Sequence, residues 1–578
     1  MRKSKKKPVR KSTRPKGTYP WLNGYPDGVK WDTRFKAEPL NAVLSRTIER
    51  HGDRICTHFV GKTITYGEIG NLVDRCAKGL QNIGVRKGTK VGLLLPNCPA
   101  YVIFYFGILK AGGIVVNCNP LYTVEELDHQ IKDSETEIMV TLDLAVLFEK
   151  AEGLLARKAL DKAVVCSFTD MLTPIKSMLF RILKSKTLAR SFNSELKSRI
   201  ISDREILGND GRPEPVEIEP ERDVAVLQYT GGTTGLPKAA MLTHANLTIN
   251  IQQVEAWCAD LLGEKERILA ILPLFHVFAM TSVLNFGVAR GYEIVLMPRF
   301  DIEEALKLIA KTQPTIFPGV PTIYNAILHH PKTKSLDLSS LKFCISGGAA
   351  LPVEVKRGFE ALSGCSLVEG YGLSETSPVA TCNPPHDSAV EGSIGLPLPA
   401  TVISIRSIDD PKKELPLGED GEICIAGPQV MPGYWQKPEE TKNTFTGEFF
   451  RSGDVGHMDE NGFIFIVDRL KDMINAAGFK IYPRQIEEAI YEHEAVEEVT
   501  VIGIEDEYRG EVPAAYIKLR EGHSATREDI LEFLEPKISK IEMPRDIEFR
   551  DELPKTMIGK LSKKELREER SSAPNADE

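Results

Sequence analysis

The sequence predicts an α/β protein whose pattern of elements changes twice along the chain. Short apolar runs such as KVGLLLP, GIVVN, DVAVLQYT and KFCISG alternate with longer stretches of helical periodicity, which is typical of buried strands linked by helices. From about Ala400, closely spaced strand-like pieces with glycine-rich turns replace this alternation. After Arg469, IEEAIYEHEAVEEVTVIGI and REDILEFLEPKIS indicate a compact mixture of helices and strands. We therefore expect a large α/β body over residues 31–470, ending in a β-rich lobe, and a small α+β domain over 471–578.

The N-terminal segment is expected to be a basic arm. MRKSKKKPVRKSTRPK contains nine Lys or Arg and no acid, whereas the whole chain has a net charge of −8. We expect residues 1–30 to form a disordered, solvated tail, with attraction to anionic lipid or nucleic acid as the alternative. The acidic balance of the whole chain argues against a nucleic-acid-binding protein.

Two further stretches are apolar enough to raise the question of a membrane. YVIFYFGILKAGGIVVNCNP (101–120) is interrupted by Lys110 and two glycines, so we expect a core helix, a turn and a strand there. In residues 171–200, apolar residues recur at roughly helical spacing beside seven Lys or Arg and one Glu. This pattern predicts either contact with a membrane surface or a solvated helix.

The ten cysteines show neither a CxxC pair nor regular spacing. They are expected to be reduced core residues of a cytoplasmic protein, so no disulfide framework and no cysteine-based metal site is predicted.

The stretch YTGGTTGLPK (229–238) is the first candidate for a binding site. DVAVLQYT predicts a strand, GGTTGLPK a flexible turn and HANLTINIQQVEAW the helix behind it. Backbone N–H groups, hydroxyls and a lysine would then converge on one point, which suits phosphate oxygens, although a glycine-rich turn by itself is a common structural feature. The residues that would bind phosphate are Thr230, Gly231, Gly232, Thr233, Thr234, Gly235 and Lys238.

The longer string YTGGTTGLPKAAMLTH resembles the phosphate-binding signature of the acyl-adenylate-forming superfamily. LPLFHVF (272–278), EGYGLSE (369–375), RSGD (451–454), DRLKDMINAAGFKIYPRQIE (468–487) and PKTMIGK (554–560) follow in the family's order. The resemblance extends over roughly residues 40–565. It departs from the usual pattern at Ala239, where many members have Gly, and at Ser374, where many have Thr.

The resemblance implies an ATP site, with ATP and CoA as substrates. Tyr371, between Gly370 and Gly372, would lie against adenine, although it could also be a core aromatic. Thr230 and Glu375 would hold Mg²⁺, which prefers oxygen ligands. The resemblance also places Ser374 near the α-phosphate and Asp454 and Arg469 on the ribose, while Lys238 supplies charge to the phosphates. Asp454 could instead be a turn residue, and Glu375 and Arg469 ordinary surface residues.

Lys560 is assigned the catalytic role by the same resemblance. A carboxylate that attacks the α-phosphate of ATP meets a like charge, and a lysine that contacts both groups reduces this repulsion. The family's C-terminal domain is mobile and turns about a hinge, which corresponds to Lys471. A second face, near Gly478, would then shape the thioester-forming step.

A more specific resemblance indicates the class of acid substrate. NPLYTVEELDHQIKDSE, IFPGVPTIYNAILHHP and SGGAALPVEVK look like segments of bacterial long-chain fatty-acid–CoA ligases. His276 would lie beside the carboxylate, and the glycines would leave room for a hydrocarbon chain or simply end strands. These acyl-site glycines are Gly319, Gly347 and Gly348.

Several alternatives stay open at this point. Medium-chain or aryl acids, or an acceptor other than CoA, would use the same motifs, and a binding protein without catalysis would have lost Lys560, Glu375 or Asp454. The expected partners are a fatty acid, ATP and CoA, without nucleic acid. We expect a cytoplasmic protein with peripheral contact at the inner membrane face, and a homodimer by analogy with the family.

Overall fold

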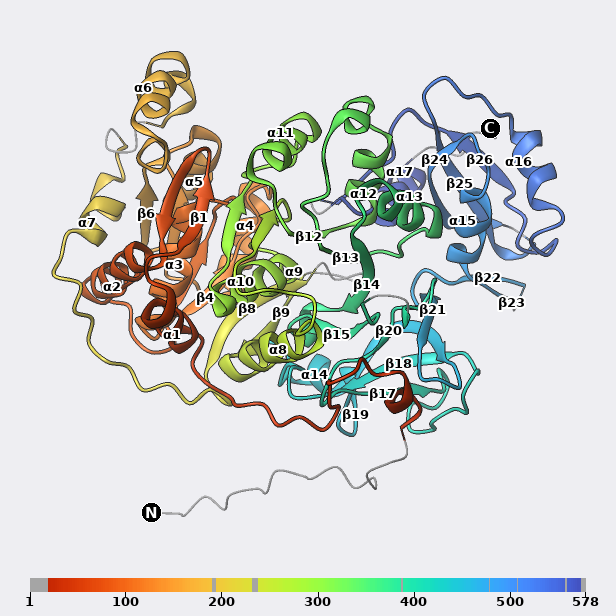
Figure 1. Ribbon diagram of the computed structural model, residues 1–578. Coiled ribbons are helices and arrows are strands. Elements are labelled where there is room, and N and C mark those ends of the chain that lie inside the picture. Colours follow the sequence, from red (N-terminus) through yellow and green to blue (C-terminus); the bar gives the residue numbers. More distant parts are fainter. Residues whose placement is uncertain are drawn as a thin grey trace.

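The computed structural model describes residues 19–189, 194–230, 237–385, 388–477, 479–506, 508–556 and 559–572. Over these residues, the strands form four sheets, of seven, nine, five and five strands (Figure 1). The first two sheets and their helices make up the α/β body, and the other two form the β-rich lobe and the C-terminal domain. The predicted fold class is confirmed, while the mobility of the C-terminal domain stays a prediction.

The seven-stranded sheet has the order β7-β6-β5-β3-β4-β8-β9 and is parallel except for the final pair β8–β9. Its central strands are buried along their whole length because helices cover both faces, as parallel sheets require. Its strands are β3 (Lys90–Leu93), β4 (Ile114–Asn117), β5 (Ile138–Leu142), β6 (Lys162–Cys166), β7 (Ile200–Ser202), β8 (Val224–Thr230) and β9 (Lys238–Thr243).

The nine-stranded sheet has the order β16-β15-β14-β13-β12-β10-β11-β1-β2, with a parallel centre and antiparallel edges. The parallel strands end at the same edge, where their loops can converge. The strands are β1 (Ile55–Phe59), β2 (Lys62–Thr65), β10 (Arg267–Ala270), β11 (Glu293–Leu296), β12 (Ile316–Gly319), β13 (Phe343–Gly347), β14 (Ser366–Gly372), β15 (Val379–Cys382) and β16 (Leu396–Pro397).

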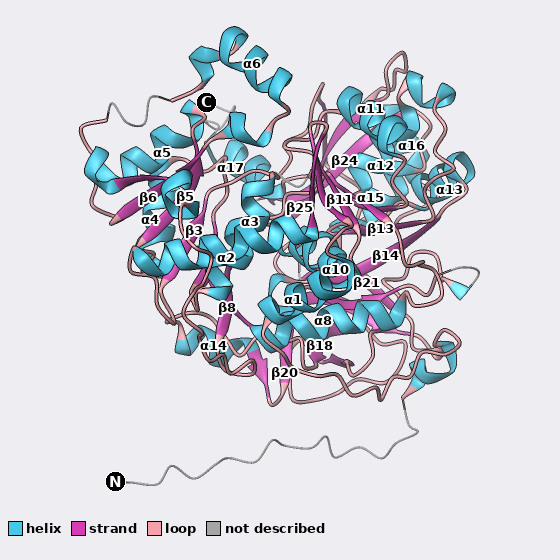
Figure 2. Cartoon of the chain, turned by 60° about the vertical axis from the view of Figure 1, so that its left-hand side comes forward, coloured by secondary structure: helices cyan, strands magenta, loops and turns pink. Residues whose placement is uncertain are grey.

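The helix α3 (Pro99–Lys110) is buried on almost every side, as the apolar stretch 101–120 predicted. It contacts β3 and β4 on one side and the helices α1 and α2 on the other (Figure 2). Such a position explains why the helix has no polar face. The helices of the body are α1 (Leu40–His51), α2 (Tyr66–Asn82), α4 (Val124–Ser134), α5 (Ala145–Ala156), α6 (Pro174–Leu183), α7 (Asp203–Leu207), α8 (His244–Trp257), α9 (Val277–Ala279), α10 (Phe286–Arg290), α11 (Ile302–Thr312), α12 (Pro321–His329) and α13 (Val353–Ser363).

The prediction of a disordered arm over residues 1–30 is wrong for its second half. Residues 1–18 lie outside the described residues, but Tyr19 and Trp21 stack at 4.6 Å between ring centroids, and Trp21 is 1% exposed. Trp31 Nε1 donates a hydrogen bond to the carbonyl oxygen of Thr401 in the β-rich lobe at 2.8 Å. The aromatic residues give this segment apolar area to bury, which the lysine-rich part lacks.

The β-rich lobe consists of one antiparallel sheet. The chain leaves this sheet at Arg469 and enters the sheet of the C-terminal domain at Ile474, so the predicted hinge residue Lys471 lies in the connection. The elements of the two units are β17 (Val402–Arg406), β18 (Gly421–Ala426), α14 (Pro438–Thr444), β19 (Phe445–Thr446), β20 (Phe449–Met458) and β21 (Ile464–Arg469), followed by β22 (Ile474–Ala476), β23 (Phe479–Ile481), α15 (Pro483–Tyr491), β24 (Val496–Asp506), β25 (Gly510–Leu519), α16 (Arg527–Leu534), β26 (Asp546–Phe549) and α17 (Lys563–Ser572).

The C-terminal domain rests on the body near α12. Thr322 Oγ1 donates to the carbonyl oxygen of Gly559 at 2.8 Å, and the side chains of Arg520 and His329 are 3.1 Å apart between Nη1 and Nε2. Over the described residues, no helix is both long and apolar enough to cross a bilayer.

Candidate active site

The predicted phosphate loop connects two paired strands and is not followed directly by a helix. Thr230 ends β8 and Lys238 begins β9, and the two residues pair across the hairpin. The predicted helix HANLTINIQQVEAW is confirmed as α8 (His244–Trp257), but it starts at the far end of β9, where Thr243 caps it, so a strand separates its N-terminus from the loop. The run KAAMLT forms the strand β9, which pairs with β8 at the edge of the sheet. Gly231, Gly232, Thr233, Thr234 and Gly235 lie outside the described residues.

The predicted adenine motif is fixed by close packing at the end of β14. A side chain on Gly372 would place its Cβ 1.9 Å from the carbonyl oxygen of Pro378, and one on Gly370 would lie 2.9 Å from Ile345 Cδ1. Gly372 is therefore required for β14 to pair with β15, because any larger residue would collide with backbone, whereas Gly370 only faces the end of the Ile345 side chain. Ser374 begins the short 3-10 helix η8 (Ser374–Thr376), which turns the chain back into β15.

Tyr371, Asp454 and Arg469 form one contiguous polar group. The hydroxyl of Tyr371 donates to Asp454 Oδ2 at 2.6 Å, and Arg469 Nε lies 3.1 Å from Asp454 Oδ1. Asp454 and Arg469 face each other in the register of β20 and β21, which fixes their separation. The structure thus brings together a predicted adenine residue and both predicted ribose residues from separate parts of the chain.

Glu375 is buried and is held by a residue that the sequence did not indicate. Tyr434 donates its hydroxyl to Glu375 Oε1 at 2.7 Å, and the Nζ of Lys238 lies 5.6 Å from the centre of the Tyr434 ring. Burial raises the pKa of Glu375, and the Tyr434 hydrogen bond opposes this rise. Tyr434 therefore links the carboxylate to the end of the phosphate loop. It follows a glycine in MPGYWQK, a string that carries no recognisable signal of this role.

Thr230 and Glu375 lie on elements that contact each other, β8 and η8. Their hydroxyl and carboxylate oxygens are ligands of the kind that Mg²⁺ prefers. The described residues contain no group of three or more His, Cys, Asp or Glu that could hold a metal ion. This donor set fits Mg²⁺, which commonly takes one or two protein ligands and completes its shell with phosphates and water.

Lys560 enters the site from the C-terminal domain. Its Cε and Nζ would lie 2.4 Å and 3.0 Å from a Cβ placed on Gly348, so the lysine side chain passes directly over this glycine. Burial lowers the pKa of Lys560 to about 8, and the charge of Arg469 adds to this effect while Asp454 opposes it. The lysine is thus close enough to the ribose-site residues for their charges to act on it.

His276 lies at the start of α9, beside the same lysine. Its Nδ1 accepts the backbone N–H of Phe278 at 3.2 Å, so a neutral ring carries its proton on Nε2. Burial, with a smaller contribution from Lys560, lowers the pKa of His276 to about 3. The imidazole is therefore uncharged at neutral pH and can form hydrogen bonds. It does not add a second positive charge beside Lys560.

The three glycines predicted to line an acyl pocket face three different neighbours. A side chain on Gly347 would meet the ring of Phe278 at 3.1 Å, and Gly348 makes room for Lys560. The prediction is wrong for Gly319, because its open side is filled by the ring of Tyr324 at 2.9 Å. Gly319 pairs with Ser346, so by the alternation of the strand it faces the side of the sheet opposite to Gly347.

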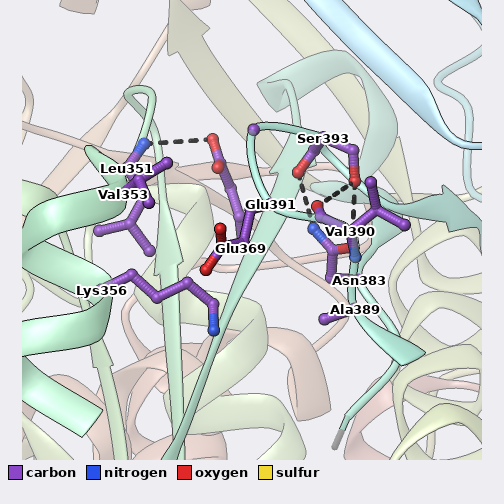
Figure 3. Close-up of a pocket in the computed structure, with 10 residues that line it drawn as sticks. Leu351, Val353, Lys356, Glu369, Asn383, Ala389, Val390, Glu391 and Ser393 are labelled. Atoms are coloured by element: carbon purple, nitrogen blue, oxygen red, sulfur yellow. Dashed lines mark hydrogen bonds between the residues drawn. The ribbon is translucent and has the colours of Figure 1, made fainter. Parts of the chain in front are cut away.

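A second buried carboxylate stands at the start of the adenine motif. Glu369 Oε1 accepts the backbone N–H of Leu351 at 3.3 Å, and Figure 3 shows Glu369 near Lys356 among the residues that line a cavity of about 10 Å³. Burial raises the pKa of Glu369 to about 7, and the charge of Arg484 from the C-terminal domain opposes this rise. The cavity is too small for a ligand, so we assign Glu369 no direct contact with substrate.

Two family models match the chain. One is described as AMP-binding enzyme and matches residues 44–435, and the other, AMP-binding enzyme C-terminal domain, matches residues 485–560. The chain belongs to the AMP-binding enzyme family. The predicted resemblance is confirmed, and the residues assembled above lie in or between the two matched regions.

The similar proteins include three named enzymes. A long-chain-fatty-acid–CoA ligase of Bacillus subtilis is 43% identical over 95% of this chain and 98% of its own length. A protein of the same name from Escherichia coli is 37% identical over 95% and 98%. A feruloyl-CoA synthase of Amycolatopsis is 34% identical over 90% and 95%.

Solved structures of similar proteins share the fold. The ATP-bound structure of MatB from Rhodopseudomonas palustris has a TM-score of 0.80 at 27% identity, covering 93% of this chain and 99% of its own. The anthranilate CoA ligase AuaEII with anthranoyl-AMP has a TM-score of 0.80 at 26% identity, covering 93% and 98%. Apo MatB gives a TM-score of 0.71 over 92% and 99%. The arrangement described here is therefore more similar to the ATP-bound than to the apo form of MatB.

Tyr434→Phe should weaken the use of Mg²⁺. The change removes one hydrogen bond to a buried carboxylate, worth about 1.5–3 kcal/mol, so the Mg²⁺ concentration for half-maximal diphosphate release should rise about tenfold or more. Tyr292→Phe, which removes a hydroxyl that donates to Gly263 far from the site, is the matched control. Equal changes in the two variants, or no change in the first, would contradict the role of Tyr434.

Gly348→Ala should displace Lys560 and reduce acyl-adenylate formation about 100-fold, because misplacement of a reacting group by about 1 Å has an effect of this size. Gly348 has φ +85°, so the variant is also strained. Gly364→Ala is the matched control, since Gly364 has φ +72° and no atom within 4 Å of its Cβ position. Both variants should lose similar stability in a thermal melt. If both also lost similar activity, the contact between Gly348 and Lys560 would not be what positions the lysine.

Proposed function

We propose that this chain is a long-chain fatty acid–CoA ligase, which converts ATP, a fatty acid and CoA into acyl-CoA, AMP and diphosphate. The observation that supports this most directly is the entry of Lys560 into a site formed by Gly348, His276, Asp454 and Arg469. The names of the relatives in Bacillus subtilis and Escherichia coli support the class of acid and the thiol acceptor.

In the first step, a carboxylate oxygen of the fatty acid attacks the α-phosphorus of ATP, and the bond to the β-phosphate oxygen breaks. Lys560 places a positive charge between two anions that would otherwise repel each other. Asp454 and Arg469 hold the ribose, and Tyr371 lies against adenine. Neutral His276 orients the acid without adding charge.

In the second step, the CoA thiolate attacks the acyl carbonyl carbon, and AMP leaves with the bridging oxygen. The mixed anhydride supplies the leaving group that a free carboxylate lacks. We propose that the C-terminal domain turns about Lys471 between the two steps and brings the region of Gly478 to the thiol path. Gly478 lies outside the described residues. The hinge connection agrees with this proposal, because the change of sheet occurs beside Lys471.

Mg²⁺ is proposed to bind Thr230 and Glu375. When bound, it would neutralise charge on the phosphates. The contribution of the chain is to hold the Glu375 carboxylate by the Tyr434 hydroxyl and to keep Lys238 beside the same ring.

We propose that the acyl tail enters a small apolar cavity on the side of the nine-stranded sheet that Gly347 faces. Phe343 and Ile345, four and two residues before Gly347 on the same face of β13, line this cavity, and the Phe278 ring stands over Gly347. The cavity of about 30 Å³ holds only a few atoms, so Phe278 and its neighbours must move for a long chain to enter. Its lining residues are Val254, Trp257, Cys258, Ser282, Phe286, Ile316, Pro318, Phe343, Ile345, Val379, Cys382 and Leu398.

An aryl- or medium-chain acid is the second candidate, since a feruloyl-CoA synthase and an anthranilate CoA ligase are among the similar proteins. Mass-spectrometric detection of acyl-CoA from a panel of acids from acetate to oleate, with benzoate and coumarate, decides between them. Acyl-AMP without acyl-CoA would indicate another acceptor. A cytoplasmic location, contact with the inner membrane face and a homodimer stay predictions.

Lys560→Ala should reduce acyl-AMP formation at least ~100-fold, because it removes a charge aimed at the reacting groups. Transfer of a supplied acyl-AMP to CoA should change little, because this step does not use the lysine. Both half-reactions can be followed by chromatography of nucleotides. Lys564→Ala is the matched control, since Lys564 is exposed on α17 of the same domain. Equal loss of both half-reactions in Lys560→Ala would contradict the two-step assignment.

Ser282→Leu should shift the acid preference towards shorter chains. Ser282 is buried at the cavity, and a leucine there fills space that the acyl tail needs. Each methylene no longer buried lowers kcat/KM about fourfold, since a buried methylene contributes ~0.8 kcal/mol. The ratio of kcat/KM for hexadecanoate to that for octanoate, measured in one variant, is independent of general loss of folded protein. An unchanged ratio would show that the tail lies elsewhere.

A further inference from the structure

Helix α6 (Pro174–Leu183) presents its apolar side to solvent. Its exposed residues recur at the spacing of one helix face, and each of them is between 46% and 75% exposed. In a helix of a globular protein this face normally packs against the core, so the arrangement here is the reverse of the usual one. The five exposed residues are Ile175, Met178, Leu179, Ile182 and Leu183, which we call the α6 stripe.

The orientation of α6 is fixed by contacts on its other face. The ring of Phe180 packs on Phe168 with 5.0 Å between ring centroids, and Arg181 Nη2 donates to Thr169 Oγ1 at 2.7 Å. Lys176 Nζ donates to the carbonyl oxygen of Val60 at 2.8 Å. These contacts hold the helix against the edge of the body, and both views show it projecting from the rest of the chain (Figures 1 and 2). The outward direction of the α6 stripe is therefore set by specific packing.

Positive charge borders the α6 stripe. Residues 171–189 contain four Lys or Arg and no Asp or Glu. Lys184 and Lys186, directly after the helix, are exposed. Over the part of the chain that the structure describes, neither forms an ion pair, whereas Arg181 is paired with Asp170. An exposed apolar stripe bordered by free lysines is the composition of helices that lie in the interface of an anionic bilayer.

We propose that α6 docks on an anionic lipid surface, with the α6 stripe inserted among the acyl chains and Lys184 and Lys186 at the headgroups. A second copy of the chain is a less suitable partner for the α6 stripe. In a two-fold dimer centred on this helix, Lys184 and Lys186 would face the same lysines of the other copy, and their like charges would repel. This proposal does not depend on the reaction proposed above. It would place the protein at a surface into which apolar acids partition.

Insertion can be measured directly with a fluorescent label at one position. All ten cysteines are buried, so Leu179→Cys introduces an exposed thiol that reacts selectively with an environment-sensitive fluorophore. Vesicles of phosphatidylglycerol and phosphatidylcholine should shift its emission to the blue and increase its intensity. The matched control is Leu121→Cys, since Leu121 is equally an exposed leucine, 69% accessible, away from α6. No shift at Leu179→Cys, or the same shift at both positions, would overturn the proposal.

Vesicle sedimentation of the full chain tests the contribution of each part. The triple variant Ile175→Ser, Met178→Ser, Ile182→Ser should bind anionic vesicles about 100-fold more weakly, because three apolar side chains no longer insert. Lys184→Gln and Lys186→Gln should each weaken binding about fivefold. The control variant Leu121→Ser, Val146→Ser, Leu417→Ser also replaces three exposed apolar residues and should bind like the unchanged chain.

The basic N-terminal segment is present in every one of these variants. If this segment alone bound the lipid, all variants would bind vesicles equally well, and this result would overturn the proposal. Acyl-CoA formation from a water-soluble acid should be the same in all variants, which verifies folding. Sedimentation velocity measures whether the chain forms a dimer and so tests a second copy as the partner. A dimer that the α6 triple variant dissociates, together with vesicle binding that it does not change, would assign the α6 stripe to a second copy of the chain.

Discussion

The placement of a charged lysine in a half-buried site is the constraint on which the rest of this structure depends. Lys560 loses hydration there, and the charges of Arg469 and Lys471 act against its own charge. Of the described groups whose charges act on it, Asp454 alone favours the ammonium form. A site with this surplus of positive charge is suited to a polyanion. The binding of a nucleotide and the docking of the C-terminal domain should therefore stabilise each other.

The described contacts between this domain and the rest of the chain include single hydrogen bonds and one lysine side chain. Lys560 lies over a glycine, and Thr322 donates one hydrogen bond to the backbone of Gly559. A single hydrogen bond contributes about 1 kcal/mol, which is compatible with the proposed movement of the domain between the two steps. The residues proposed to contact adenine and ribose, Tyr371, Asp454 and Arg469, lie in contrast on paired strands. In the proposed reaction, these strands position the nucleotide and the C-terminal domain supplies the cation.

Helix α6 exposes its apolar side chains, whereas helix α3 buries them. Both are rich in apolar residues, but α3 is enclosed by a sheet and two helices, whereas the α6 stripe has no covering element among the described residues. Apolar side chains that a fold leaves uncovered lower its solubility unless another surface receives them. The bordering lysines indicate which surface that is.

The sequence by itself determined the classes of element and the motifs, because alternation and periodicity are local properties. The strands around Ile114, Ile316 and Phe343 and the helix of residues 101–110 are where the apolar pattern predicts them, and the family is as predicted. Tertiary structure alone decided which side chains meet. Tyr434 reaches Glu375 across 59 residues, and Gly319 faces away from Gly347 because of strand register. Such contacts depend on how distant segments pair and pack, which no local pattern contains.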